Sequence, residues 1–155
     1  MKIVYGDLFE NPSDGDAICV STNGVVKRDG CAVMGAGIAK EFADRWGRLP
    51  ALLGAKIKDR GNHVYGLLYV RDVEKDTKYA ILSFPTKEHF KDKSDIELIK
   101  RSCKELVILT DNKGFKNVYL PLPGCGLGGL KKEDVVPELE KILDDRFVLV
   151  LREES

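Results

Sequence analysis

The sequence lacks the features of membrane, secreted and metal-binding proteins. No stretch approaches the roughly 18 consecutive apolar residues of a membrane span, and the opening MKIVYGDLFE contains no long apolar segment of a signal peptide. The four cysteines show no C-x-x-C spacing, and only two histidines are available to help them bind a metal. We therefore expect a cytoplasmic protein with reduced thiols, no metal site and no membrane partner.

A surplus of charge of either sign is also absent. Lys and Arg total 25, as do Asp and Glu, so the net charge is zero. This balance provides no global field to recruit nucleic acid or an anionic membrane, and any anionic ligand has to be held by local geometry. The phosphate-binding motif G-x-x-x-x-G-K-[ST] and internal repeats are missing too. The length fits a single domain over residues 1–155, which we expect to be a monomer without a cofactor.

What the chain does contain is an alternation of short apolar runs and amphipathic stretches. The runs KIVY, DAICVST, NVYLPLP and RFVLVL are typical of strands, and HVYGLLYVRD and KYAILSFPTK predict a hairpin joined through VEKDT. Strands that alternate with helices predict an α/β layered domain with a largely parallel sheet. In such sheets ligands bind at the carboxyl ends of the strands.

Amphipathic spacing predicts the first two helices. In GAGIAKEFADRW, Ile38, Phe42 and Trp46 recur at every fourth position and form one apolar stripe of a helix. The stretch PALLGAKIKDRG predicts a second helix, which ends at Gly61.

Two further helices are predicted in the second half of the chain. In SDIELIKRSCKELVILTDNKG, Ser94 and Glu97 have the S-x-x-E spacing of a capping box, and Gly114 ends the helix. KKEDVVPELEKILDD predicts the last helix, in which Pro137 either starts the regular part or introduces a kink.

Glycine-rich segments precede the first and last of these helices. VMGAGIAKEF and LPGCGLGGLKKED each run from glycines into a helix, so unpaired backbone N–H groups and a helix dipole would face one small volume. Two such loops facing each other would suit a diphosphate, which explains how a neutral protein could hold a doubly charged ligand. Taken alone, each cluster is equally compatible with a tight turn, because glycine is the default turn residue.

The ordered motifs YGDLFE, DAICVSTN, MGAGIA, SFPTK and LPGCGLGGL together resemble the macrodomain family, whose members bind ADP-ribose. The pairing of MGAGIA with FPTK is most similar to the branch that contains the terminal ADP-ribose protein glycohydrolase and the macrodomain antitoxins that remove ADP-ribose from DNA. The resemblance implies a three-layer α/β/α fold around a mixed sheet. It also implies that ADP-ribose lies in a cleft over the carboxyl edge of that sheet.

The resemblance further implies roles for particular residues. Asp7 would accept a hydrogen bond from the adenine amino group, and Asn23 would contact the distal ribose, although each residue type is equally suited to a turn. Lys87, which ends FPTK, would be the catalytic nucleophile that attacks the anomeric carbon of the distal ribose. A lysine attacks only when it is deprotonated, and the alternative role of Lys87 is an ordinary surface lysine. The ADP-ribose-binding residues implied are Asp7, Leu8, Asn23, Met34, Gly35, Ala36, Gly37, Ile38, Pro85, Thr86, Gly124, Cys125, Gly126, Leu127 and Gly128.

Two departures separate this chain from the family members that it resembles. The protein glycohydrolase has an aspartate in the second glycine loop, where this chain has Gly128 or Gly129, and the DNA-directed antitoxins are more similar there. The segment 24–33 is longer than in either relative, and its charged residues Lys27, Arg28 and Asp29 would lie near the distal ribose. This segment either shapes which attached group is accepted or is a polar surface hairpin.

Three functions remain open. The favoured one is a glycohydrolase that removes ADP-ribose from a nucleic-acid or protein adduct, with Lys87 as nucleophile. The alternatives are a non-catalytic ADP-ribose reader, which needs the pocket alone, and a phosphatase acting on ADP-ribose 1″-phosphate. A single-stranded nucleic-acid adduct could dock through a local patch of Lys87, His89, Lys91 and Lys93.

Overall fold

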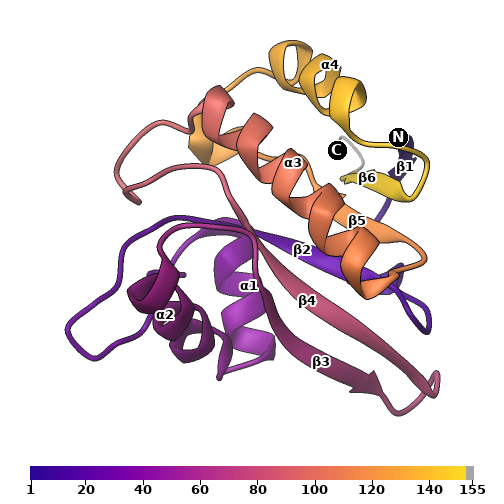
Figure 1. Cartoon of the computed structure of the whole chain (residues 1–155), viewed down its shortest axis with the longest axis horizontal. Coiled ribbons are helices and arrows are strands. Elements are labelled where there is room, and N and C mark those ends of the chain that lie inside the picture. The colour runs from indigo at the N-terminus through magenta and orange to yellow at the C-terminus, as the bar shows by residue number, and fades with distance from the viewer. Residues whose placement is uncertain (153–155) are drawn as a thin grey trace.

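The computed structural model, shown in Figure 1, describes residues 1–152 and is built around one mixed sheet. Its six strands lie in the order β1-β6-β5-β2-β4-β3. Every neighbouring pair is parallel except β3 and β4, which form the predicted antiparallel hairpin. The strands are β1 (Lys2–Tyr5), β2 (Ala17–Thr22), β3 (Gly66–Asp72), β4 (Thr77–Pro85), β5 (Val118–Pro121) and β6 (Phe147–Leu151).

Helices cover both faces of this sheet. The helices α1 (Gly37–Arg45) and α2 (Leu49–Arg60) lie on one face, and α3 (Ile96–Lys113) and α4 (Lys132–Ile142) lie on the other (Figure 1). Two 3-10 turns, η1 (Leu8–Glu10) and η2 (Gly126–Gly128), follow β1 and β5. The predicted three-layer α/β/α fold is confirmed. Within the described part of the chain, no helix is both long enough and apolar enough to cross a membrane.

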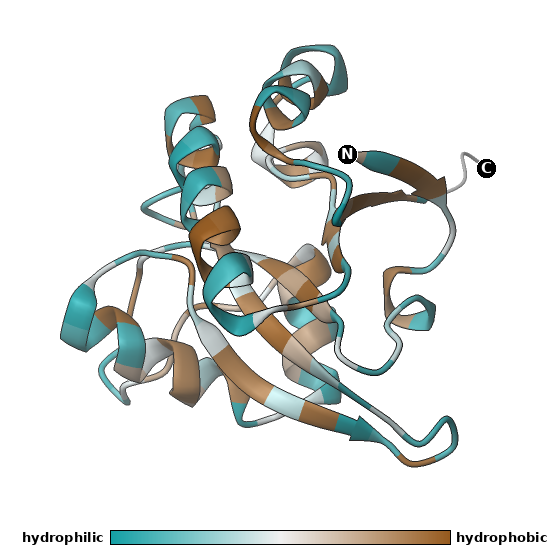
Figure 2. Ribbon diagram, turned by 45° about the vertical axis from the view of Figure 1, so that its right-hand side comes forward, coloured by the Kyte–Doolittle hydropathy of each residue, from teal (hydrophilic) through white to brown (hydrophobic). Residues whose placement is uncertain are grey.

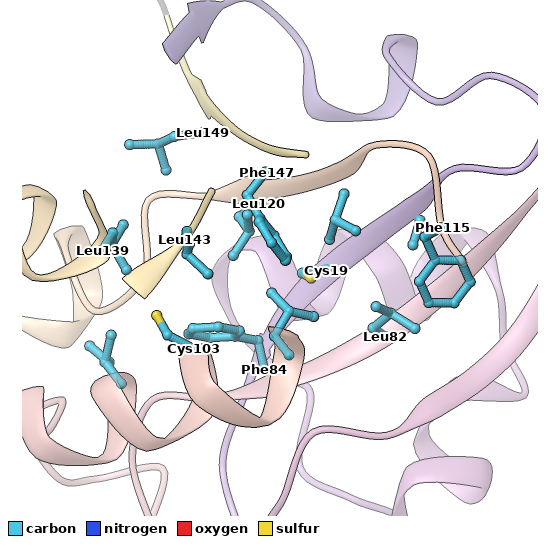
Figure 3. Packing of buried hydrophobic residues seen from close by; sticks show 14 of the residues in the cluster. Cys19, Leu82, Phe84, Cys103, Phe115, Leu120, Leu139, Leu143, Phe147 and Leu149 are labelled. Carbon is cyan, nitrogen blue, oxygen red and sulfur yellow. The ribbon is translucent and has the colours of Figure 1, made fainter. Parts of the chain in front are cut away.

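The sheet separates two hydrophobic cores because successive side chains of a strand point to opposite faces. In β2, Cys19 joins the core beneath α3 and α4, whereas Ile18 and Val20 join the core beneath α1 and α2. Figure 3 shows the first of these cores, where Phe84 and Cys103 pack between α3 and the sheet. In Figure 2 the strands are mostly brown, whereas the helices are teal on their outward sides. A strand buried on both faces explains why DAICVST is apolar without interruption.

The capping box predicted for α3 is wrong by one residue. Asp95 is the N-cap, and its carboxylate accepts a hydrogen bond of 2.9 Å from the N–H of Glu97. Ser94 lies before the helix, where its own N–H donates to the carbonyl oxygen of Gly128 at 2.9 Å. This contact turns Ser94 toward the second glycine loop and leaves the adjacent carboxylate to cap the helix.

The predicted helix ends are confirmed at two glycines. Gly114 ends α3 in a left-handed conformation, with a φ of 71°, and Gly61 ends α2. Pro137 lies inside α4 and does not start it. Because proline has no N–H, α4 lacks the hydrogen bond that residue 137 would otherwise donate within the helix.

Candidate functional site

A cavity of about 1290 Å³ lies over the carboxyl edge of the sheet. The segment directly after each parallel strand contributes to its lining. These residues include Asp7 after β1, Asn23 after β2, Thr86 and Lys87 after β4, Leu122 after β5, and Arg152 after β6. The carboxyl ends of parallel strands meet at one edge, so the fold itself gathers these side chains.

The cavity extends across the sheet from β1 to β4, so its two ends lie far apart. β1 and β4 have three strands between them, and the strand spacing of about 4.8 Å puts them about 19 Å apart. Asp7 therefore marks one end and Lys87 the other. We call these the Asp7 end and the Lys87 end of the cleft.

All but one of the predicted site residues line this cavity. The exception is Pro85, the last residue of β4, which is buried in the sheet beside Thr22 of β2. Its carbonyl oxygen accepts a hydrogen bond of 2.7 Å from the hydroxyl of Ser102. Pro85 therefore supports the cavity floor from below, and it is the following Thr86 that reaches the surface of the cleft.

The first glycine loop presents unpaired backbone donors to the cavity. Ala36 is the N-cap of α1 and provides no side-chain hydrogen bond, and the first intrahelical bond of the turn runs from Lys40 to Ala36 at 3.3 Å. Among residues 1–152, the N–H groups of Gly37, Ile38 and Ala39 have no acceptor. These donors and the positive end of the helix dipole make the start of α1 suitable for an anion.

The second glycine loop is tightly packed against α3. Gly124 has a φ of +78°, and a Cβ atom there would lie 2.7 Å from Cδ1 of Ile99. Gly126 has a φ of +69° but faces open space. Within the described chain, the N–H groups of Leu127 and Gly128 also lack an acceptor. Leu127 reaches the first loop, since its Cδ1 lies 3.3 Å from where a Cβ on Gly37 would be.

At the Asp7 end the polar side chains are already engaged. One carboxylate oxygen of Asp7 accepts a hydrogen bond of 2.9 Å from the N–H of Phe9, so Asp7 caps η1. Arg152 and Glu41 form an ion pair of 2.6 Å beside it. The other oxygen of Asp7 accepts no hydrogen bond from the described residues. Asp7 therefore performs the turn role that its residue type suggested and still keeps one oxygen for a ligand.

Phe9 is a cavity residue that the sequence reasoning missed. Its ring packs beside Phe42, and the guanidinium of Arg45 lies 3.8 Å from the ring centroid. The signal was its position in the YGDLFE motif, directly after the cap at Asp7. Phe9 gives the Asp7 end an apolar wall suited to a flat ring.

Asn23 holds the segment 24–33 in place. Its side-chain amide donates to the carbonyl oxygen of Val33 at 3.0 Å, and its amide oxygen accepts from the N–H of Val25 at 3.0 Å. The segment is a hairpin, with a β-bridge between Val26 and Ala32. None of its charged residues Lys27, Arg28 and Asp29 lines the cavity. This geometry agrees with the surface-hairpin alternative.

Lys87 lies at the other end of the cleft and is partly buried. Its carbonyl oxygen accepts a hydrogen bond of 3.1 Å from the side-chain amide of Asn62. Thr86, just before it, is tied to β2 by a hydrogen bond of 3.0 Å from its N–H to the carbonyl oxygen of Thr22. The Nζ of Lys87 has no hydrogen-bond or ion-pair partner in the described chain. The backbone of Lys87 is therefore held in place, whereas its amine is available to a ligand.

Two further residues near Lys87 were missed as cavity residues. Ser94 is only 6% exposed. Phe90 is 40% exposed and stacks on His89 with ring centroids 4.4 Å apart. The sequence predicted Ser94 only as a helix cap. Phe90 lies between the residues of the predicted basic patch, but it was not included in that patch. Of the four patch residues, only Lys87 lines the cavity.

Cys125 lines the cavity but has the character of a packed thiol. Burial, and secondarily the charge of Glu133, raise its pKa above the ordinary range of a thiol. The thiolate is therefore disfavoured at neutral pH, which agrees with a role for Cys125 through its backbone and not as a nucleophile.

Comparisons with known proteins agree with this geometry. The family model described as Macro domain matches residues 29–139. The chain is 33% identical over 129 residues to the DNA ADP-ribosyl glycohydrolase of Mycobacterium tuberculosis, a match that covers 81% of this chain and 36% of that protein. It is 29% identical over 150 residues to the human ADP-ribose glycohydrolase OARD1, covering 91% of this chain and 82% of that protein. The solved macrodomain of Thermus aquaticus DarG superposes with a TM-score of 0.73 at 25% identity, covering 99% of this chain and 97% of that one. The chain thus spans little more than a third of the mycobacterial protein.

Proposed function

Because the chain belongs to the macrodomain family, we propose that it binds ADP-ribose in the cleft and hydrolyses the bond that joins ADP-ribose to a nucleic-acid or protein adduct. The single observation that carries this proposal is Lys87, which lines the cavity with an amine that has no partner among the described residues. The names of the mycobacterial and human relatives, both glycohydrolases, support it.

In this proposal ADP-ribose spans the cleft from the Asp7 end to the Lys87 end. Adenine lies at the Asp7 end, where the free carboxylate oxygen of Asp7 accepts from its amino group and Phe9 contacts its ring. The diphosphate lies between the two glycine loops and accepts hydrogen bonds from their unpaired N–H groups. The distal ribose then lies at the Lys87 end, beside Asn23.

The chemistry at that end is nucleophilic catalysis by an amine. The deprotonated Nζ of Lys87 attacks the anomeric carbon of the distal ribose and forms a carbon–nitrogen bond. The bond from that carbon to the adduct breaks, and the adduct leaves with the bonding electrons and takes up a proton. The ribose ring opens to an imine, which water hydrolyses to free ADP-ribose and the original lysine.

Product analysis on a panel of substrates tests this proposal. The panel contains ADP-ribosylated proteins, ADP-ribosylated oligonucleotides and ADP-ribose 1″-phosphate. We expect free ADP-ribose from at least one macromolecular adduct. Binding of ADP-ribose without any product would instead identify a reader, and release of inorganic phosphate alone would identify a phosphatase.

A nucleic-acid adduct is the substrate that we favour. The mycobacterial relative is named for DNA, and the Phe90 ring beside the cavity is exposed and stacked on His89, with Nζ of Lys91 5.9 Å from its centroid. An exposed aromatic ring next to lysines is a typical stacking surface for an unpaired base.

The variant Phe90→Ala tests this preference. Because a stacked base contributes about 1 to 3 kcal/mol, hydrolysis of a modified oligonucleotide should fall about fivefold or more, and by more than the affinity for free ADP-ribose falls. Tyr69→Ala, which removes another exposed ring outside the cavity, is the matched control. Release of ADP-ribose from modified proteins alone, with oligonucleotides untouched, would contradict the preference.

A further inference from the structure

Ser94 lies in the cavity wall beside the second glycine loop. Its N–H donates to the carbonyl oxygen of Gly128, which fixes it against the second glycine loop. The residue is only 6% exposed, yet it is part of the cavity wall. Its hydroxyl has no hydrogen-bond partner anywhere in residues 1–152. The Oγ atom itself is not one of the enclosed side-chain atoms that lack a partner, so it opens onto the cavity, where a ligand or water can complete its hydrogen bonds.

The hydroxyl also occupies the space of a loop side chain. A Cβ atom added to Gly128 would overlap the Oγ of Ser94. Gly128 is therefore the residue that makes room for the hydroxyl, and the second loop cannot carry a side chain of its own at that point. The polar group that faces the ligand there comes from the segment before α3.

Ser94 and Lys87 lie at the two ends of one closed loop. The carbonyl oxygen of Thr86 accepts a hydrogen bond of 2.8 Å from the N–H of Asp95, and this bond closes the segment 87–94 into a loop. Lys87 is the first residue of this loop and Ser94 is the last, and both line the cavity. The acidic residues of the cavity wall, Asp7 and Glu41, belong to the other end.

From this geometry we propose that the hydroxyl of Ser94 hydrogen-bonds the distal ribose of ADP-ribose and so helps to hold the sugar against Lys87. The inference rests on the proposed function, because it assigns a substrate contact within the same cleft. A hydroxyl suits this task, since it both donates to and accepts from the hydroxyl groups of a sugar.

The test compares two nucleotides that differ only at this end. Dissociation constants for ADP-ribose and for ADP, which lacks the distal ribose, are measured with the whole chain and with Ser94→Ala. The loss of one hydrogen bond predicts that the variant binds ADP-ribose about five- to tenfold more weakly and ADP within about twofold of the wild type. Equal losses for both nucleotides, or no loss for either, would overturn the inference.

Gly128→Ala gives an independent route to the same loss. Its Cβ displaces the hydroxyl of Ser94, so the variant should lose the same discrimination between ADP-ribose and ADP, and the double variant should lose no more than either single one. Additive losses would contradict a shared contact. The matched control is Ser102→Ala, inside the helix α3 that follows Ser94. It removes a buried hydroxyl that bonds to Pro85 away from the cavity, so it should lower the melting temperature without any discrimination between the nucleotides.

The two proposals fail in different ways. Wild-type protein that binds neither nucleotide would overturn the proposed function and this inference together. Wild-type binding of ADP-ribose with an unchanged affinity in Ser94→Ala would overturn the inference alone.

Discussion

The Asp7 end and the Lys87 end of the cleft are built in opposite ways. At the Asp7 end the polar side chains bond mainly to the protein, since one carboxylate oxygen of Asp7 caps η1 and Arg152 pairs with Glu41, which leaves the other oxygen of Asp7 for a ligand. At the Lys87 end the backbone is held firmly, but the Nζ of Lys87 and the Oγ of Ser94 have no partner among the described residues. Groups that are already satisfied keep a fixed shape for recognition, whereas unsatisfied groups keep their bonding capacity for a substrate.

This contrast separates binding from chemistry along one cleft. Substitutions at the Asp7 end should change affinity with little effect on turnover, and substitutions of Lys87 should do the reverse. The glycine loops between the two ends should affect both, because they hold the diphosphate that links the two halves of the ligand.

The largest expected effect is at Lys87. Lys87→Ala should reduce hydrolysis of an ADP-ribosylated adduct by about a hundredfold or more, because a nucleophile acts mainly in the transition state. Affinity for ADP-ribose, measured by calorimetry, should change little. Lys104→Ala on the exposed side of α3 is the matched control and should leave both quantities unchanged. A parallel loss of affinity and turnover in Lys87→Ala would remove the contrast between the two ends.

The next effect is at the second glycine loop. Gly126 has a φ of +69°, which a β-branched residue adopts only with strain, so Gly126→Val should distort the loop that holds the diphosphate. ADP-ribose at about 100 times its dissociation constant should stabilise the wild type by about 2.7 kcal/mol, seen as a rise in melting temperature. Gly126→Val should lose that rise.

A second glycine provides the control for backbone strain. Gly114 has a φ of +71° and also faces open space, but it ends α3 outside the cavity. Gly114→Val should lower the melting temperature and keep the rise with ADP-ribose. If Gly126→Val binds normally, the diphosphate lies elsewhere.

A smaller effect is expected at Asp7. Asp7→Ala should weaken ADP-ribose binding by about 1.5 to 3 kcal/mol, the range for a hydrogen bond to a charged group, and leave ribose 5-phosphate binding unchanged. Asp7→Asn is the sharper variant, because its amide oxygen can still cap Phe9 while its NH₂ replaces the free acceptor. Equal losses for both ligands would assign Asp7 to structure alone.

The smallest effect concerns the helix behind the Lys87 end. Asp95 caps α3, so Asp95→Ala should lower the free energy of unfolding by about 1 kcal/mol in a urea titration. ADP-ribose affinity should stay unchanged, because Asp95 does not line the cavity. A change in affinity without a change in stability would mean that Asp95 belongs to the site.

Local patterns were sufficient to predict the layers of the fold. Alternating apolar runs and helical stripes predicted the six strands and four α-helices of the described residues, but not the two 3-10 turns, and the glycine clusters predicted loops that the structure brings side by side. The cap of α3 was predicted one residue early because S-x-x-E spacing takes no account of the bond between Ser94 and Gly128. That contact joins residues far apart in the sequence, as does the ion pair of Arg152 with Glu41. Such pairings depend on the packed fold and leave no local signal.

One measurement tests the central claim about Lys87 most directly. Wild-type protein is incubated with an ADP-ribosylated substrate and borohydride and is then digested, and the masses of its peptides are measured by mass spectrometry. The account predicts a reduced ADP-ribose adduct on Lys87 in the wild type, and neither adduct nor hydrolysis in Lys87→Arg, whose guanidinium stays protonated. Full hydrolysis by Lys87→Arg, with no adduct on the wild-type lysine, would contradict it.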